Sequence, residues 1–283
     1  HNNTAVGLEA LQTNTTGDAN TAVGTGALAL ATTADNNTGI GRSALSANTT
    51  GTSNTAVGAS AGAAITTGQG NSILGYLAAD AITTGGDNTA MGYKSLTTNT
   101  TGSYNVAFGK DALENATTSS YNTAVGFKSL EANTTGGSNT AVGSLALDAN
   151  TSADGNVAIG VNAASATTTG NSNTAVGQNA ALLNTTGTYN VVVGGHAFDA
   201  NTTGSYNTAI GGNALTTATT ASNNVALGYA ALGLNTTGTQ NTSLGAYTLD
   251  ANTTANANTA VGYQALSANT TGTENTALGI DAL

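Results

Sequence analysis

Apolar and polar residues alternate along this chain in a pattern that recurs every 17 positions without insertion or deletion. In the first repeat the segment from Asn3 to Gly7 reads Asn-Thr-Ala-Val-Gly. Asparagine starts this segment in all seventeen repeats, and glycine ends it in all seventeen. We call the residues that recur at this period a column and name each column by its first member. A fixed period of this kind indicates a repeat architecture in which each unit stacks on its neighbours.

The segment 3–6 has the alternation of a short strand, and the same holds for the matching segment of every later repeat. In an extended segment Thr4 and Val6 point to one side and Ala5 to the other. The Val6 column holds Val, Ile, Leu, Met or Phe throughout, so we expect it to face an interior. The Ala5 column is alanine in thirteen repeats. Because a solvent-facing strand would show polar residues there, we expect the Ala5 face to be covered closely by another copy of the chain.

The remainder of the repeat predicts a bend, a core position and a turn. Gly7 marks a bend or a close backbone approach. The Leu11 column is Leu in twelve repeats and Phe at 198, so we expect it to complete the core. The segment from Asn14 to Gly17 reads Asn-Thr-Thr-Gly and has turn chemistry. Two helices with their turns need about 33 residues, so we predict an all-β parallel β-solenoid with one coil per 17-residue repeat, about 17 coils in all.

Correlated substitutions support the stacking of one repeat on the next. Gly62 and Ala79 replace the core leucine in successive repeats, and Ile65 and Ile82 replace the asparagine of the Asn14 column in the same two repeats. Lost volume is regained nearby, as close packing requires. The pattern predicts that the Asn14 column points partly inward, where it could form an asparagine ladder. We expect residues 1–283 to form one continuous array that is a piece of a longer chain.

Composition excludes several classes of function. The chain has four Lys and Arg residues, 14 Asp and Glu residues and a net charge of −10, so we expect no binding to nucleic acid or to an anionic membrane. Cysteine is absent, which excludes disulfides and thiolate metal sites. No apolar run approaches the ~18 residues of a membrane span, so we expect no membrane insertion in this segment.

Two segments resemble the head repeats of YadA-like trimeric autotransporter adhesins. They are Val-Ala-Ile-Gly at 157–160 and Val-Ala-Leu-Gly at 225–228. The fuller unit at 258–272 is similar to repeats of bacterial and phage tail-fibre-type proteins. The resemblance covers the whole chain and implies a left-handed parallel β-roll, a trimer whose strands face a common axis, and a surface or virion setting. The adhesin heads mostly repeat at a shorter spacing than this chain does.

Candidate chemical sites are few, and each has a simpler interpretation. His196, the one internal histidine, reads as an exposed residue without a catalytic partner. Six acidic residues share one column, and they indicate either a solvated edge or a weak calcium site, since neighbouring carboxylates repel. These six are Asp80, Glu114, Glu131, Asp148, Asp199 and Asp250.

Three further features concern the surface. The Thr15 and Thr16 columns could bind ice, or their hydroxyls could bond along the stack. Lys94, Asp111 and Lys128 give alternating charge in one column. Tyrosines pair in neighbouring repeats and could stack on sugars, and the pairs are Tyr76 with Tyr93, Tyr104 with Tyr121, and Tyr189 with Tyr206.

The sequence predicts a non-catalytic structural protein with no catalytic residues, no cofactor and no metal site. We expect an extracellular fibre or surface adhesin segment, at the cell surface or in a virion tail fibre, that associates with itself as a homotrimer. A surface glycan or a host receptor would be a possible partner. One alternative is the subunit of a filament polymerised end to end, because nothing in the sequence caps the solenoid. A second alternative is an ice- or glycan-binding β-solenoid.

Overall fold

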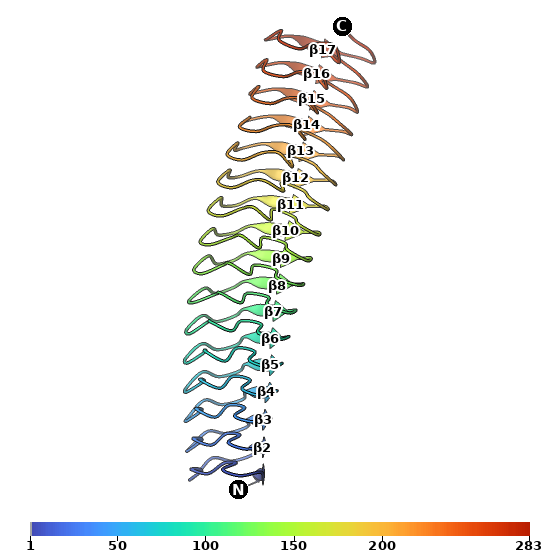
Figure 1. The fold of residues 1–283 in the computed structure, drawn as a ribbon. Coiled ribbons are helices and arrows are strands. Elements are labelled where there is room, and N and C mark those ends of the chain that lie inside the picture. The colour runs from blue at the N-terminus through green and yellow to red at the C-terminus, as the bar shows by residue number, and fades with distance from the viewer. Residues whose placement is uncertain (1) are drawn as a thin grey trace. The chain divides into compact units, whose positions relative to one another are not determined.

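The computed structural model describes residues 2–283 and divides the chain into two compact units, His1–Asn139 and Thr140–Leu283. Each unit is a stack of β-coils, with one coil per repeat and the coils following one another in chain order (Figure 1). No helix occurs among residues 2–283. The predicted all-β class is therefore confirmed.

Each coil contributes one short strand, and every strand begins at the same position of its repeat. The first unit holds β1 (Thr4–Val6), β2 (Thr21–Val23), β3 (Thr38–Ile40), β4 (Thr55–Val57), β5 (Ser72–Leu74), β6 (Thr89–Met91), β7 (Val106–Phe108) and β8 (Thr123–Val125). The second unit holds β9 (Thr140–Val142), β10 (Val157–Ile159), β11 (Thr174–Val176), β12 (Val191–Val193), β13 (Thr208–Ile210), β14 (Val225–Leu227), β15 (Thr242–Leu244), β16 (Thr259–Val261) and β17 (Thr276–Leu278).

Within each unit every strand pairs in parallel with the next strand along the chain. Each residue lies opposite the equivalent residue of the next repeat, as Thr89 lies opposite Val106 in the first unit and Ala158 opposite Ala175 in the second. This register is the one that a coil of exactly one repeat requires, and it confirms the predicted parallel β-solenoid.

Backbone hydrogen bonds between coils continue beyond the strands. The amide of Leu28 donates to the carbonyl of Ala44 at 3.0 Å, and the amide of Thr49 donates to the carbonyl of Thr66 at 2.9 Å. Polar backbone groups are thus paired around most of the coil, which is why buried loops are tolerated here. Proline would remove a donor from this ladder, and the chain contains none.

The side chains of the strands point in the directions opposite to those predicted. The Ala5 column lies inside the coil, where Ala22, Ala56 and Ala175 have no exposed surface. The Val6 column lies outside, and Ile40 and Phe108 are 39% and 52% exposed. The expectation that the alanine face is covered by another copy of the chain is therefore wrong, because the chain covers that face itself.

The narrow interior of the coil explains why alanine is needed there. The opposite wall is formed by the Leu11 column, in which Leu28 and Leu45 are fully buried. A Cβ at Gly39, a member of the Ala5 column, would lie 3.3 Å from Cγ of Leu28. One small and one large residue fill the space between the two walls, so a larger residue on the strand needs a smaller partner. The predicted core role of the Leu11 column is confirmed.

The predicted exchange of volume between columns is also confirmed. A Cβ at Gly62 would lie 3.0 Å from Cδ1 of Ile65 and 2.9 Å from Cδ1 of Ile73. These two isoleucines therefore occupy the space that a leucine fills in other coils. Ile65 and Ile82 are both fully buried, although asparagine is usual in their column.

The Asn3 column forms a buried ladder that the sequence analysis did not predict. The Asn54 amide group donates from Nδ2 to the carbonyl of Gly68 at 2.8 Å. Its Oδ1 accepts the backbone amide of Asn71 at 3.0 Å and the side-chain amide of Asn71 at 3.0 Å. Each asparagine thus ties the start of its strand to a turn and to the next asparagine. Among side chains of this length, only the amide of asparagine carries both a donor and an acceptor at these places.

The Asn14 column points inward, as predicted, and parts of it form a second ladder. Asn201 donates from Nδ2 to Oδ1 of Asn184 at 2.9 Å, and Asn252 donates to Oδ1 of Asn235 at 3.0 Å. All four side chains are buried. The two asparagine columns therefore supply most of the polar side chains of the core.

Candidate functional site

The most extensive chemical feature of the surface is the outer strand face, which we define as the residues of the Thr4 and Val6 columns. In the first unit this face carries Thr or Ser, with Val106 as the exception, beside a continuous column of aliphatic and aromatic side chains. Leu74 and Phe108 are 46% and 52% exposed. No residue of either column is charged.

An apolar outer face is unusual for a parallel sheet that is open on that side. Parallel strands normally have both faces covered, and their sequences then read as nearly continuous apolar runs. Here the inner face is covered by the Leu11 column, whereas the single chain leaves the outer face in water. Contiguous exposed apolar surface of this kind marks an interaction site in soluble proteins.

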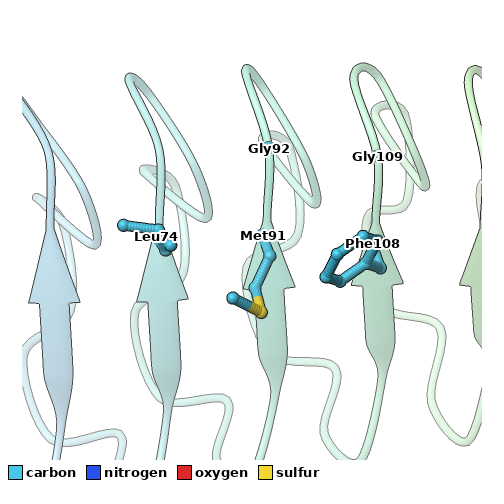
Figure 2. A pocket seen from close by; sticks show the side chains of 5 residues that line it. All are labelled: Leu74, Met91, Gly92, Phe108 and Gly109. Carbon is cyan, nitrogen blue, oxygen red and sulfur yellow. The ribbon is translucent and has the colours of Figure 1, made fainter.

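The outer strand face is least regular at β5, β6 and β7. Figure 2 shows Leu74, Met91 and Phe108 standing on these three adjacent strands. Together with Gly92 and Gly109 they line a hollow of about 380 Å³. The three side chains are larger than the valine that is usual in this column, so they project further and leave a recess between them. This stretch gives the face a shape as well as an apolar character.

The second unit widens the apolar band by replacing threonines with valines. Val191 and Val225 occupy the Thr4 column and are 40% and 37% exposed. Ile159 and Leu227 continue the Val6 column and are each 41% exposed. Each unit by itself therefore presents a full-length apolar stripe along its strands.

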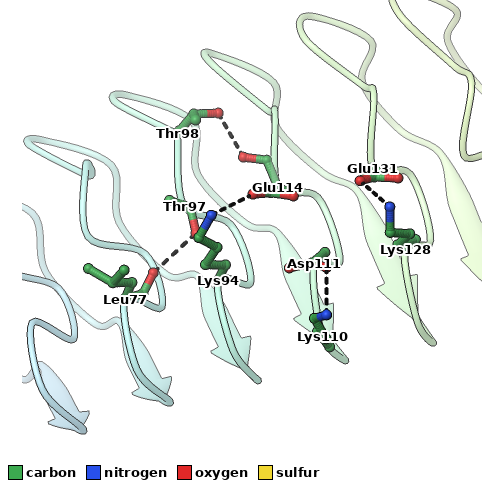
Figure 3. A network of polar contacts seen from close by, with 9 residues as sticks. All are labelled: Leu77, Lys94, Thr97, Thr98, Lys110, Asp111, Glu114, Lys128 and Glu131. Carbon is green, nitrogen blue, oxygen red and sulfur yellow. Dashed lines mark hydrogen bonds and ion pairs between the residues drawn. The ribbon is translucent and has the colours of Figure 1, made fainter.

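In the first unit the structure pairs two of the three predicted acidic residues, Glu114 and Glu131, with lysines (Figure 3). Lys94 Nζ lies 3.4 Å from Oε1 of Glu114, and Lys128 Nζ lies 2.9 Å from Oε1 of Glu131. These hydrogen bonds raise the pKa of both lysines. Since these two carboxylates already have cationic partners, they do not need calcium to offset their repulsion.

The alternating charges of Lys94, Asp111 and Lys128 act on one another within their column, and Asp111 also pairs with a lysine of the adjacent column. Lys110 Nζ lies 3.6 Å from Oδ2 of Asp111, its neighbour in the chain. The same ammonium group lies 5.7 Å from the ring centroids of Tyr93 and Phe127, within cation–π range. Asp111 is buried, but the lysines of these pairs remain at least one-third exposed. Pairs with such solvated ammonium groups contribute about 1 kcal/mol or less each, so the cluster is a partly solvated edge rather than a source of stability.

His196 lies beside an acidic residue but not in a catalytic arrangement. Its Nδ1 is 3.4 Å from Oδ2 of Asp199, and its side chain is 51% exposed. The hydroxyl of Thr216 donates to Oδ1 of Asp199 at 2.9 Å. A nucleophile would have to donate to the imidazole instead, so this trio lacks the relay of a hydrolase triad.

The hydroxyls of the Thr15 column bond along the stack, as one of the two interpretations predicted. Thr49 donates from Oγ1 to the carbonyl of Thr66 at 3.1 Å, and Thr185 donates to the carbonyl of Thr202 at 2.9 Å. The protons of these hydroxyls are therefore directed into the protein. In the Thr15 column this arrangement argues against a flat array of free hydroxyls that could match an ice lattice.

The three predicted tyrosine pairs form ring contacts. Tyr104 and Tyr121 stack with centroids 5.1 Å apart, and Tyr189 and Tyr206 stack at 5.4 Å. Tyr76 and Tyr93 are tilted, with centroids 5.8 Å apart. Their phenol rings therefore stabilise one another along the stack and remain exposed on one side.

Within residues 2–283 no cluster of three or more His, Asp or Glu side chains has the geometry of a metal site. No helix in this range could serve as a membrane span. Comparison of the chain with protein-family models, with curated proteins and with solved structures found no match.

Proposed function

We propose that this chain is a structural segment of an extracellular fibre or surface adhesin whose copies associate through the outer strand face. One observation carries the proposal: the parallel strands of both units expose an uncharged apolar stripe that recurs on every coil. Burial of exposed apolar surface between copies would stabilise an assembly by roughly 25 cal/mol per Å². Copies of the chain would therefore meet at the outer strand face, and not at the Ala5 face that the sequence predicted.

A second copy of the same chain fits this stripe better than an unrelated partner does. The stripe repeats at every coil, so a copy with the same spacing of about 4.8 Å can meet it along its full length. The absence of charge from both columns lets identical surfaces meet without repulsion. Three copies around one axis is the arrangement that the resemblance to trimeric adhesin heads implies. Mutual burial of the stripe would stiffen the assembly, which suits a shaft or a head.

The association predicts a specific effect of charge on the outer strand face. Replacing both Val125 and Val176 by lysine is expected to weaken assembly at least tenfold, because an unpaired ammonium group would be buried between copies. Each coil should remain folded, since both side chains lie outside it and are only partly buried in the single chain. Sedimentation equilibrium of the wild type and of the variant measures the effect. Thr203→Lys, at an exposed turn, is the matched control and should assemble like the wild type.

The solution mass also separates the alternatives. A discrete trimer supports the fibre segment, whereas open-ended polymers that survive the Val125→Lys, Val176→Lys double substitution support a filament joined end to end. A wild-type chain that stays monomeric at high concentration contradicts the proposal.

A further inference from the structure

The regular surface of the second unit is interrupted on one coil. The columns of Glu9 and of Gln12 carry polar or large side chains in most coils, but the coil that follows β14 has Ala230 and Gly233 at these two positions. Gly233 is the one glycine in its column, and Ala230 is the one alanine in its column. Side chains are thus missing from one coil between two coils that have them, which leaves a notch.

The notch has a floor, two walls and a rim. Ala230 and Gly233 form the floor. The coil before contributes Asn213 and Thr216, and the coil after contributes Tyr247 and Asp250. Leu234 stands at the rim and is 54% exposed. The hollow measures about 280 Å³, and its walls belong to coils two spacings apart, which is roughly 9.6 Å.

The tyrosine wall is held in place by its neighbours. The ring of Tyr247 meets Tyr229 edge to face, with centroids 5.4 Å apart and planes at 70°. On its other side it meets Tyr263 in the same manner, at 6.1 Å and 84°. Edge-to-face contacts of this kind are favourable and fix the ring orientation. The notch therefore presents an aromatic surface that needs little ordering when a ligand binds.

The acidic wall has an unused acceptor. Oδ1 of Asp250 is buried and has no hydrogen-bond partner. Burial also raises the pKa of this carboxyl group, and backbone hydrogen bonds only partly oppose the effect. Leaving a buried acceptor unpaired is unfavourable, so rotation of the Asp250 carboxylate to bring Oδ1 to a donor in the notch would form a hydrogen bond that the free protein lacks.

We propose that this notch binds one pyranose ring of a neutral saccharide. A pyranose has C–H groups that pack on an aromatic ring and hydroxyl groups that donate to a carboxylate and exchange hydrogen bonds with an amide. Tyr247, Asp250 and Asn213 supply these three surfaces around one hollow. Small-ligand sites typically combine apolar walls with a few placed polar groups in this way. The notch residues lie outside the strands, so the site is independent of the proposed self-association.

Ligand-observed NMR on the full chain tests the site with the methyl glycosides of glucose, galactose, mannose and N-acetylglucosamine. We expect at least one of the four to bind with a millimolar dissociation constant. Gly233→Leu should fill the notch and weaken that binding at least tenfold, and Tyr247→Ala should remove the aromatic wall with a similar effect. Both replacements occur naturally in the same columns, as Leu182 and Ala230, so the coils should fold.

Ala63→Leu, which adds the same side chain to the same column in the first unit, is the control and should leave binding unchanged. The proposal is overturned if none of the four glycosides binds at tens of millimolar. It is equally overturned if binding persists in Gly233→Leu, or if tetramethylammonium binds the notch and no glycoside does.

Discussion

Replacing Gly194 by alanine is expected to lower the free energy of unfolding by about 3 kcal/mol or more. Gly194 has a φ of +141°, which side chains rarely adopt. A Cβ there would also lie 2.5 Å from the carbonyl oxygen of Gly211 and 2.6 Å from its carbonyl carbon. Because the obstacle is the backbone of the next coil, the stack must open locally to admit one methyl group.

The adjacent residue provides the control for this prediction. Gly195 lacks the positive φ, and a Cβ there would meet only the carbonyl oxygen of Gln178, at 3.9 Å. Gly195→Ala is therefore expected to change stability by about 0.5 kcal/mol or less. Chemical denaturation followed by circular dichroism measures both variants. Equal stability of the two variants would contradict the close approach of successive coils at the Gly7 column.

Replacing Asn190 by alanine is expected to lower the free energy of unfolding by about 3 kcal/mol, because the change leaves several buried groups without hydrogen-bond partners. Nδ2 of Asn190 donates to the carbonyl of Gly204 at 2.9 Å. Its Oδ1 accepts the backbone amide of Asn207 at 3.0 Å and the side-chain amide of Asn207 at 3.1 Å. Asn190 is 1% exposed, so water cannot replace the lost bonds without entering the core.

Asn256 offers a matched exposed asparagine in the same unit. Its Oδ1 also accepts a backbone amide from a neighbouring coil, that of Thr239, at 2.7 Å, but the bond is exposed. Water can take over that acceptor role, so Asn256→Ala should cost about 1 kcal/mol or less. The same denaturation experiment compares the two. A loss at Asn190 no larger than the loss at Asn256 would contradict the buried ladder.

The length of the coil could be predicted from the sequence because the period is unbroken and because substitutions compensate between neighbours. Gly62 and Ile65 show this most clearly, since the isoleucine fills the space that the glycine leaves. The Leu11 column could also be placed in the core, because no other column in the turn region is so consistently large and apolar.

Hydrophobicity alone could not predict which side of each strand lies inside the coil. Alternation separates Ala5 from Val6 but does not say which of the two is inside. The assumption that the larger apolar residue is buried fails here, because the interior has room for alanine opposite a leucine such as Leu28. The sequence did contain a signal, since within the strand the Ala5 column varies less than the Val6 column, as expected of the side under tighter packing.

Other features depended on conformations that residue preferences disfavour. Leu28 and Leu45 have φ values of 49° and 52°, in the left-handed region that leucine seldom enters. Packing of the leucine side chain inside the coil outweighs this local cost. The notch at Ala230 and Gly233 was missed for a different reason, because it arises from missing side chains rather than from a motif.

Single cysteines test most directly whether copies associate through the outer strand face, since the natural chain has no cysteine. Val176→Cys, Ala175→Cys and Thr203→Cys place one thiol on the outer face, inside the coil and at an exposed turn. After mild oxidation of the assembled protein, the account predicts disulfide-linked dimers for Val176→Cys and for neither of the other two on a non-reducing gel. Linked dimers from Ala175→Cys, or none from Val176→Cys, would contradict it.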